Sequence, residues 1–366
     1  SRQAKQYMWV IVLTSLATLA AFIPTDSLRL GQTNIILPET GKKSALGTWS
    51  WGNRLLYGYS NERDEAIIAT YLEARRNGIC MFDTGDSYGT GGLQGNAERL
   101  LREGEERFKI VEDFYSAPPA IFIAKIAVYP WLLSADSYYQ KILQSRERLG
   151  FGEGEADNAN HFIPSMHWSP RNYAPWQVKP ILEGLATAFE EGLCSGIGVS
   201  NLGPNELLIC ADFFQKRDVP IAANQIQCSL VSNFEADVEG ALAVGLDIGV
   251  DTLGYSCLGL GVLGGNRPGG LRGSFFEALQ GDPGGKILLE EVRKIGEENG
   301  VPTTVVAIAW VRKRGLIPLF GARGVTQLKE NIADFDFVLG IDAEERLEKC
   351  RKKLTKMAVR NAFMTQ

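Results

Sequence analysis

The sequence predicts an α/β fold of the (β/α)8 type, in which eight parallel strands close into a barrel and helices surround it. Two observations predict this fold. Short apolar runs alternate with segments of helical periodicity from residue 45 to about residue 334. Three polar residues that end apolar runs, Asp83, Lys125 and His167, follow one another at intervals of 42 residues. Because that interval accommodates one strand and one helix, we expect the three side chains to meet at the carboxyl-terminal end of the barrel.

The composition is that of a large globular domain. The chain has 366 residues, of which 45% are hydrophobic, and a barrel of this type takes about 250 residues. Its net charge of −5 and the absence of a basic run argue against nucleic acid as a partner. The six cysteines show no CxxC or CxxxH spacing, which indicates neither a metal site nor a disulfide framework.

The chain divides into four segments. Residues 7–23 are seventeen residues without a charge, which is at the lower limit of about 17–25 for a membrane-spanning helix and above the apolar core of a signal peptide, about 7–15. We therefore expect a membrane-spanning helix there, with a targeting remnant as the alternative and the topology open. The predicted divisions are an anchor or remnant at 1–26, a connector at 27–43, the barrel at 44–340, and a C-terminal helix and tail at 341–366.

The first half of the barrel follows the strand and helix order closely. Gly78 is a natural helix end before a buried strand. Pro164 cannot donate to a strand ladder, so the fourth strand should be short or bulged. The predicted strands are 45–49, 79–82, 120–126 and 162–166, and the predicted helices are 62–77, 96–106, 136–149 and 175–192.

The second half repeats this pattern with one interruption. Residues 259–285 are rich in glycine and contain two prolines, which predicts a long flexible excursion after the seventh strand. The predicted strands are 196–201, 221–225, 247–255 and 316–320, and the predicted helices are 287–299, 303–314, 325–334 and 343–356.

The polar groups near the strand ends could carry acid–base chemistry. A tyrosine is a weak acid near neutral pH, so a proton-donating Tyr88 needs a cation beside it, and Lys125 could supply it. Asp83 could hold the lysine, and the imidazole of His167 could orient a carbonyl group. The alternative is a structural ion pair with a phenol nearby, and for His167 a histidine satisfied in the core.

These residues, together with the segment FDTGDSYG at 82–89, resemble the Asp, Tyr, Lys and His tetrad of the aldo-keto reductases. The likeness runs in the family's order from about residue 41 to about residue 340. It includes Gly47–Gly52, Gly198–Asn201, Asn224–Gln225, Tyr255–Ser256 and Gly321–Arg323. The resemblance implies reduction of a small-molecule aldehyde or ketone by NADPH, with Tyr88 as the proton donor.

The resemblance also implies a cofactor site. Ser200, Asn201 and Gln225 would bind the nicotinamide carboxamide, although they could simply end strands. Arg323 at a helix N-terminus would bind the 2′-phosphate, and the excursion at 259–285 would cover the pyrophosphate. The remaining cofactor residues implied by the family are Gly47, Thr48, Trp49, Tyr255, Ser256, Leu258, Gly321, Gln327, Glu330 and Asn331.

The chain departs from the family pattern at two cysteines. Cys228 stands where an aromatic ring is expected on the nicotinamide, and Cys257 stands where the family has proline. With the apolar N-terminus, they motivate an alternative function: a membrane-anchored, weakly active or inactive subunit of a larger membrane complex. The motifs are similar to those of plant and algal plastid members, which predicts a membrane-anchored protein of the plastid thylakoid.

Overall fold

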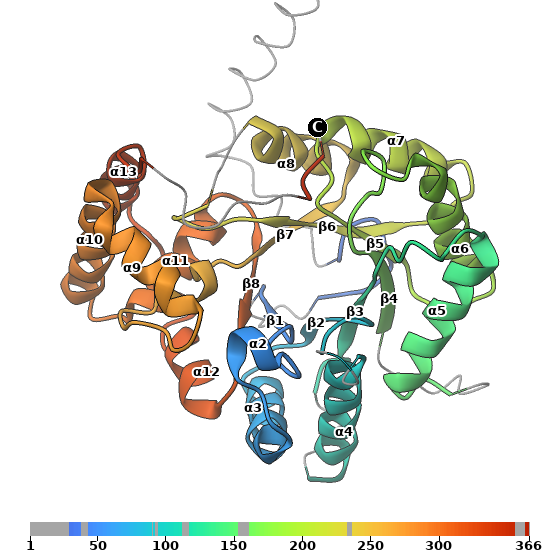
Figure 1. The fold of residues 1–366 in the computed structure, drawn as a ribbon, viewed down its shortest axis with the longest axis horizontal. Coiled ribbons are helices and arrows are strands. Elements are labelled where there is room, and N and C mark those ends of the chain that lie inside the picture. The colour runs from blue at the N-terminus through green and yellow to red at the C-terminus, as the bar shows by residue number, and fades with distance from the viewer. Residues whose placement is uncertain are drawn as a thin grey trace, which may run out of the picture.

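Eight parallel strands form a closed barrel in the order of the sequence (Figure 1). The computed structural model describes residues 29–37, 43–89, 91, 94–111, 117–152, 161–232, 236–355 and 363–365. The first strand pairs with the last, for example through Leu46 and Phe320, which closes the cylinder. The predicted (β/α)8 fold is therefore confirmed.

The strands are short and buried. Every residue of the second and third strands is buried, because helices cover the outside of a parallel barrel and side chains fill its inside. Register places Asp83 beside Gly47 and beside Ile123. The strands are β1 (Ala45–Gly47), β2 (Met81–Gly85), β3 (Ile121–Ile126), β4 (His161–Met166), β5 (Ile197–Ser200), β6 (Ile221–Gln227), β7 (Asp251–Tyr255) and β8 (Ile317–Gly321).

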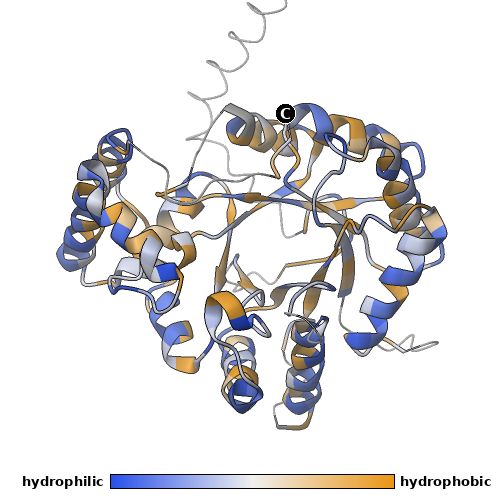
Figure 2. Cartoon of the chain, viewed as in Figure 1, coloured by the Kyte–Doolittle hydropathy of each residue, from blue (hydrophilic) through white to orange (hydrophobic). Residues whose placement is uncertain are grey.

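The helices pack their apolar faces on the barrel and turn their polar faces outward (Figure 2). The helices around the barrel are α3 (Asp64–Arg76), α4 (Asn96–Val111), α5 (Ala135–Arg148), α6 (Val178–Glu190), α7 (Pro204–Gln215), α8 (Ala236–Ile248), α11 (Thr303–Lys313) and α12 (Val325–Asn331). Further helices are α2 (Arg54–Tyr57), α9 (Arg272–Gly281), α10 (Pro283–Asn299) and α13 (Ile341–Arg351).

A short hairpin closes the amino-terminal end of the barrel. Its buried residues Leu30, Ile35 and Leu37 join an apolar cluster with residues inside the barrel, among them Met81 and Ile121 at the first positions of β2 and β3. A larger cluster fills the space between the strands and the helices. Because the amino-terminal end is filled by apolar side chains, a ligand site has room at the opposite end.

Several predicted boundaries differ from the structure. The glycine-rich segment 259–285 is not one long loop, because α9 lies within it. The strand predicted to begin at residue 247 begins at Asp251, since α8 continues to Ile248 and Gly249 then turns with a φ of 73°. The last two helices end earlier than predicted, at Asn331 and Arg351.

Pro164 does not interrupt its strand. It pairs with Ala124 in an unbroken register between β3 and β4, and the register shift lies between Ile197 and Gly198 where β5 meets β6. The other neighbour of β4 contacts it through a single pair, Ser165 with Gly198. The predicted bulge is therefore wrong for β4 itself, and the irregularity belongs to the next pair of strands.

The predicted membrane-spanning segment, residues 7–23, lies outside the described residues. Within the described part of the chain, no helix has the length and apolar character needed to cross a bilayer. The division at residues 1–26 stays a prediction.

Candidate active site

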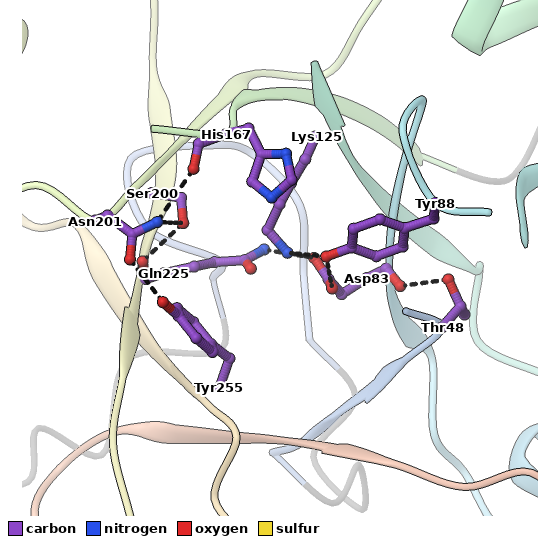
Figure 3. A network of polar contacts seen from close by, with 9 residues as sticks. All are labelled: Thr48, Asp83, Tyr88, Lys125, His167, Ser200, Asn201, Gln225 and Tyr255. Atoms are coloured by element: carbon purple, nitrogen blue, oxygen red, sulfur yellow. Dashed lines mark hydrogen bonds and ion pairs between the residues drawn. The ribbon is translucent and has the colours of Figure 1, made fainter. Parts of the chain in front are cut away.

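The predicted tetrad meets at the carboxyl-terminal end of the barrel (Figure 3). Asp83 lies in β2 and Lys125 in β3, Tyr88 follows β2 on its loop, and His167 comes directly after β4. The strands are parallel and in register, so residues near their ends project into one space. The spacing of 42 residues in the sequence thus corresponds to one step around the barrel.

Three of the four side chains contact one another. The ammonium group of Lys125 donates to Oδ1 of Asp83 and, over 3.0 Å, to the phenolic oxygen of Tyr88. The phenol in turn donates to Oδ2 of Asp83 over a long 3.4 Å. The side chains of Lys125 and Asp83 are each about 4% exposed, so this ion pair is shielded from water.

Burial sets the protonation of this cluster. It raises the pKa of Tyr88 well above its usual value, and the carboxylate of Asp83 raises it further. Burial lowers the pKa of Lys125, against the opposing effect of Asp83. We expected the lysine to make the phenol a stronger acid, but loss of solvent and the nearby carboxylate have the larger effect. The phenol of Tyr88 is therefore protonated at neutral pH.

His167 is a neutral imidazole at the edge of the cluster. Burial, and after it the cation of Lys125, lowers its pKa well below the usual value. Its ring lies 6.0 Å from the ring of Tyr88 and 4.6 Å from that of Trp168. Among the described residues, its Nδ1 is buried without a hydrogen-bond partner. Because His167 also lines the cavity, its neutral imidazole can bind a polar group there without carrying charge.

Asn201 organises the side of the site opposite Tyr88. Its backbone is left-handed, with a φ of 62°, and its amide nitrogen donates over 3.1 Å both to the carbonyl of His167 and to the hydroxyl of Ser200. The phenol of Tyr255 donates to its amide oxygen over 2.8 Å. These bonds hold three strand ends, β4, β5 and β7, at fixed distances (Figure 3).

A cavity of about 790 Å³ opens at this end of the barrel. Of the predicted residues, all but Thr48 and Gln225 line it. The lining includes Gly47, Trp49, Asp83, Tyr88, Lys125, His167, Ser200, Asn201, Tyr255, Ser256, Leu258, Gly321, Arg323, Gln327, Glu330 and Asn331.

Thr48 and Gln225, which do not line the cavity, both form hydrogen bonds to Asp83. The hydroxyl of Thr48 donates to the carbonyl of Asp83 over 2.9 Å. The amide of Gln225 donates to Oδ1 of the same aspartate over 3.0 Å, and its own oxygen has no partner among the described residues. Both residues hold Asp83 in place, and a role in cofactor binding stays a prediction for them.

Cys228 lies away from the cavity. It has no exposed surface and is absent from the lining, whereas the ring of Tyr255 lines it. The predicted loss of a ring contact at position 228 is therefore wrong, because a side chain there points into the core. Cys257 does line the cavity and donates to the carbonyl of Leu319.

Sequence reasoning missed residues at both ends of the cavity. At one end, Arg272 of α9 lies beside Tyr57, the last residue of α2, and Arg323 lies on the same ring. At the other end, Phe363 near the C-terminus packs on Trp168 with ring centres 5.1 Å apart. No local pattern marks these residues, since each contact joins segments far apart in the sequence.

Neither Arg272 nor Arg323 forms an ion pair with a carboxylate of the described residues, although both line the cavity. The hydrogen bonds of Arg272 go to the carbonyls of Leu56 and Leu260, and Arg323 donates to that of Tyr57. Two partly buried cations without a counterion form a site for an anion, and guanidinium groups suit phosphate. This end of the cavity therefore fits the phosphates of a dinucleotide.

Comparison with known proteins gives consistent matches along the chain. The model of the Aldo/keto reductase family matches residues 45–352. A chloroplastic pyridoxal reductase of Arabidopsis thaliana is 32% identical over 353 residues, which cover 95% of this chain and 92% of that protein. An NADH-specific methylglyoxal reductase of Escherichia coli is 26% identical over 336 residues, with coverages of 87% and 95%. Among solved structures, a glycerol dehydrogenase from Gluconobacter oxydans has a TM-score of 0.70 at 19% identity, covering 94% of this chain and all of that one, which shows the shared fold.

Proposed function

This chain belongs to the aldo/keto reductase family, whose members are oxidoreductases that act on carbonyl compounds with a nicotinamide cofactor. From this premise, we propose that the chain reduces an aldehyde with NADPH and that Tyr88 donates the proton. The observation that carries the proposal is the contact of Tyr88 with Lys125 beside Asp83. A phenol held by an ammonium group can release a proton to a neighbouring oxygen, because the cation stabilises the phenolate that remains.

The residues of the cavity fit this cofactor. Arg323 and Arg272 would hold its phosphates, and Ser200 and Asn201 would hold the carboxamide of the nicotinamide ring, which supplies the hydride when bound. A 2′-phosphate separates NADPH from NADH, and the uncompensated charge at this end of the cavity favours the phosphorylated form. Because the Escherichia coli relative is named NADH-specific, the affinities of this chain for NADPH and for NADH should be measured side by side.

Proton donation needs no rearrangement of the cluster. The bond from Tyr88 to Asp83 is long, 3.4 Å, so a carbonyl oxygen closer to the phenol would take the proton in its place. Lys125 stays hydrogen-bonded to the phenolic oxygen while the proton leaves. The neutral imidazole of His167 would hold the same substrate oxygen in position.

The substrate end of the cavity favours a flat aromatic aldehyde. Rings form a continuous series there, from Tyr88 to His167, then Trp168 and Phe363, and aromatic groups stack well on such surfaces. The Arabidopsis relative is named a pyridoxal reductase and chloroplastic. We therefore propose pyridoxal as a substrate and the plastid as the compartment.

The alternative, an inactive subunit of a thylakoid membrane complex, has no support in the described part of the chain. It depended on residues 7–23, which lie outside that part, and on two cysteines, of which Cys228 does not line the cavity and Cys257 does. The tetrad and the cavity next to it favour catalysis.

The test is NADPH oxidation by the purified full-length chain with pyridoxal, followed at the absorbance of NADPH, with pyridoxine identified as the product. Tyr88→Phe is the matched control, since it removes one hydroxyl and keeps the ring. Consumption of NADPH that is equal in the variant and the wild type would contradict the role of Tyr88. No consumption with pyridoxal or with any of a panel of aldehydes would contradict the proposed activity.

A further inference from the structure

Tyr57 forms the surface on which the two cavity arginines rest. The guanidinium carbon of Arg272 lies 4.6 Å from the centre of its ring, and that of Arg323 lies 5.4 Å from it. Cations at such distances from an aromatic centre are attracted by the electron-rich face of the ring. One side chain thus contacts both cations at the phosphate end of the cavity.

The three residues come from distant parts of the chain. Tyr57 follows β1, Arg272 belongs to α9 after β7, and Arg323 follows β8. Hydrogen bonds from the two guanidinium groups to backbone carbonyls join these segments. Arg272 donates to the carbonyl of Leu56 over 3.2 Å and to that of Leu260 over 3.3 Å, and Arg323 donates to the carbonyl of Tyr57 over 2.9 Å.

The position of the ring is itself well determined. Asn53 caps the amino end of α2 by accepting from the backbone N–H of Leu56, and Gly58 ends the helix in the left-handed region, with φ 60°. The ring also packs edge-on against Trp49, with centres 5.6 Å apart and planes at 79°. A side chain fixed on two sides by these contacts can fix the two guanidinium groups in turn.

The positive charge of the two arginines is not balanced by a carboxylate of the described residues, which favours the binding of an anion. Arg272 is only 8% exposed, and within the described residues neither arginine has a carboxylate partner, whereas an exposed arginine such as Arg102 does. Two like charges held on one ring repel each other unless an anion lies between or above them. The guanidinium carbons lie over the ring, and the N–H groups that do not donate to backbone carbonyls are left to bind oxygen.

We propose that Tyr57 is a positioning residue for cofactor binding: its ring holds Arg272 and Arg323 as one phosphate-binding unit, and so sets the affinity for a dinucleotide that carries a 2′-phosphate. This inference rests on the proposed use of NADPH. Tyr57 acts through the arginines and contacts none of the reacting groups, so its loss should change cofactor affinity and leave the turnover at saturating cofactor unchanged.

The experiment is titration calorimetry of the full chain with NADP⁺ and with adenosine 2′,5′-bisphosphate, which carries the 2′-phosphate and one 5′-phosphate without the nicotinamide. We expect Tyr57→Leu to weaken the binding of both probes roughly tenfold, since it removes the ring from two cations. Tyr57→Phe should bind as the wild type does, because the ring remains. Leu55→Ala, at a position of the same helix that is 75% exposed, controls for disturbance of α2, and circular dichroism with thermal unfolding checks that each variant folds.

A background that lacks both arginines separates the positioning role of Tyr57 from a general disturbance of the cavity. In an Arg272→Leu, Arg323→Leu background, Tyr57→Leu should cause little further loss, because the cations on which the ring acts are gone. Equal affinity of Tyr57→Leu and the wild type, or an equal loss in Tyr57→Phe, would overturn this inference and leave the proposed function standing. A wild-type chain that binds neither probe would overturn both.

Discussion

Lys125 donates a hydrogen bond of 3.0 Å to the phenolic oxygen of Tyr88, and both side chains are buried. The two residues are 37 positions apart in the sequence and are brought together because β2 and β3 run side by side in register. The bond joins the proposed proton donor to the cation that would stabilise its conjugate base.

Replacing Tyr88 by Phe should lower kcat for aldehyde reduction by about 10²–10⁴-fold, the usual contribution of a positioned proton donor. Cofactor affinity should stay unchanged, because the hydroxyl faces Lys125 and Asp83. Steady-state kinetics and NADP⁺ titration measure the two quantities. A loss of cofactor binding as large as the loss of kcat would contradict the role of proton donor.

The rate of reduction should be constant from about pH 6 to about pH 8. Burial first, and then Asp83, raises the pKa of Tyr88 well above its usual value, so the donor keeps its proton throughout this range. Burial lowers the pKa of His167, so the imidazole stays neutral as the pH falls through 6.5. A pH profile of kcat for the wild type and for His167→Gln checks this. A decrease below pH 7 that disappears in the variant would show that the imidazole titrates.

Pyridoxal should be a better substrate than its 5′-phosphate, by at least about tenfold in kcat/KM. Among the described residues that line the cavity, the cations other than Lys125 are Arg267, Arg272 and Arg323. Arg267 is paired with Glu277. Arg272 and Arg323 lie on Tyr57, which follows β1, whereas the ring of Trp168 follows β4, three strands further around the barrel. Lys125 is paired with Asp83. A phosphate dianion at the substrate end would be desolvated without a partner.

Kinetics with both compounds, and with an uncharged benzaldehyde as a control for aromatic binding, test this prediction. An equal kcat/KM for pyridoxal and its phosphate would show that a cation reaches the substrate end.

Removing a ring from the substrate end of the cavity should weaken the binding of aromatic substrates alone. Phe363 packs on Trp168 and lines the cavity, so Phe363→Ala removes one stacking surface, worth about 1 kcal/mol. KM for pyridoxal should rise severalfold, and KM for methylglyoxal, which has no ring, should stay the same. A parallel rise for both substrates would indicate a change in the cavity as a whole.

A buried carboxyl group outside the site should make stability depend on pH. Burial raises the pKa of Glu98 from 4.5 to about 7, although Arg148 and Ser145 act against it. Between these values the folded protein binds more protons than the unfolded chain, so the stabilising contribution is fully present below pH 4.5 and is lost as the pH rises through about 7. We expect the free energy of unfolding to fall by about 2 kcal/mol between pH 5 and pH 7.5 from this group.

The comparison uses denaturant unfolding of the wild type and Glu98→Gln at both pH values. The variant should lack this share of the pH dependence, whereas Glu297→Gln, a substitution of an exposed glutamate, should keep it. Asp86, whose pKa is raised by burial to about 6, contributes in the same direction in all three proteins. Identical slopes for Glu98→Gln and the wild type would show that Glu98 is ionised throughout.

Local patterns were sufficient to predict the barrel. Apolar runs alternate with segments of helical periodicity, and the polar residues at the ends of three successive runs follow one another at intervals of 42 residues. Asp83, Lys125 and His167 could therefore be placed in one site before any coordinate was known. The same reasoning failed for α9, because glycine-rich composition at 259–285 conceals a helix that tertiary contacts stabilise.

What the sequence by itself determined is the fold, the end of the barrel that carries the site, and the identity of the tetrad, since strand order and spacing are properties of neighbouring residues. Tertiary structure alone decided which way each side chain points and what it meets. In the folded chain, Cys228 is buried in the core and Gln225 donates a hydrogen bond to Asp83. Tyr57 contacts Arg272, which lies more than 200 residues away in the sequence. The protonation of Tyr88 was decided there too, because the pKa of a buried phenol depends on the water and charges that the folded chain leaves around it.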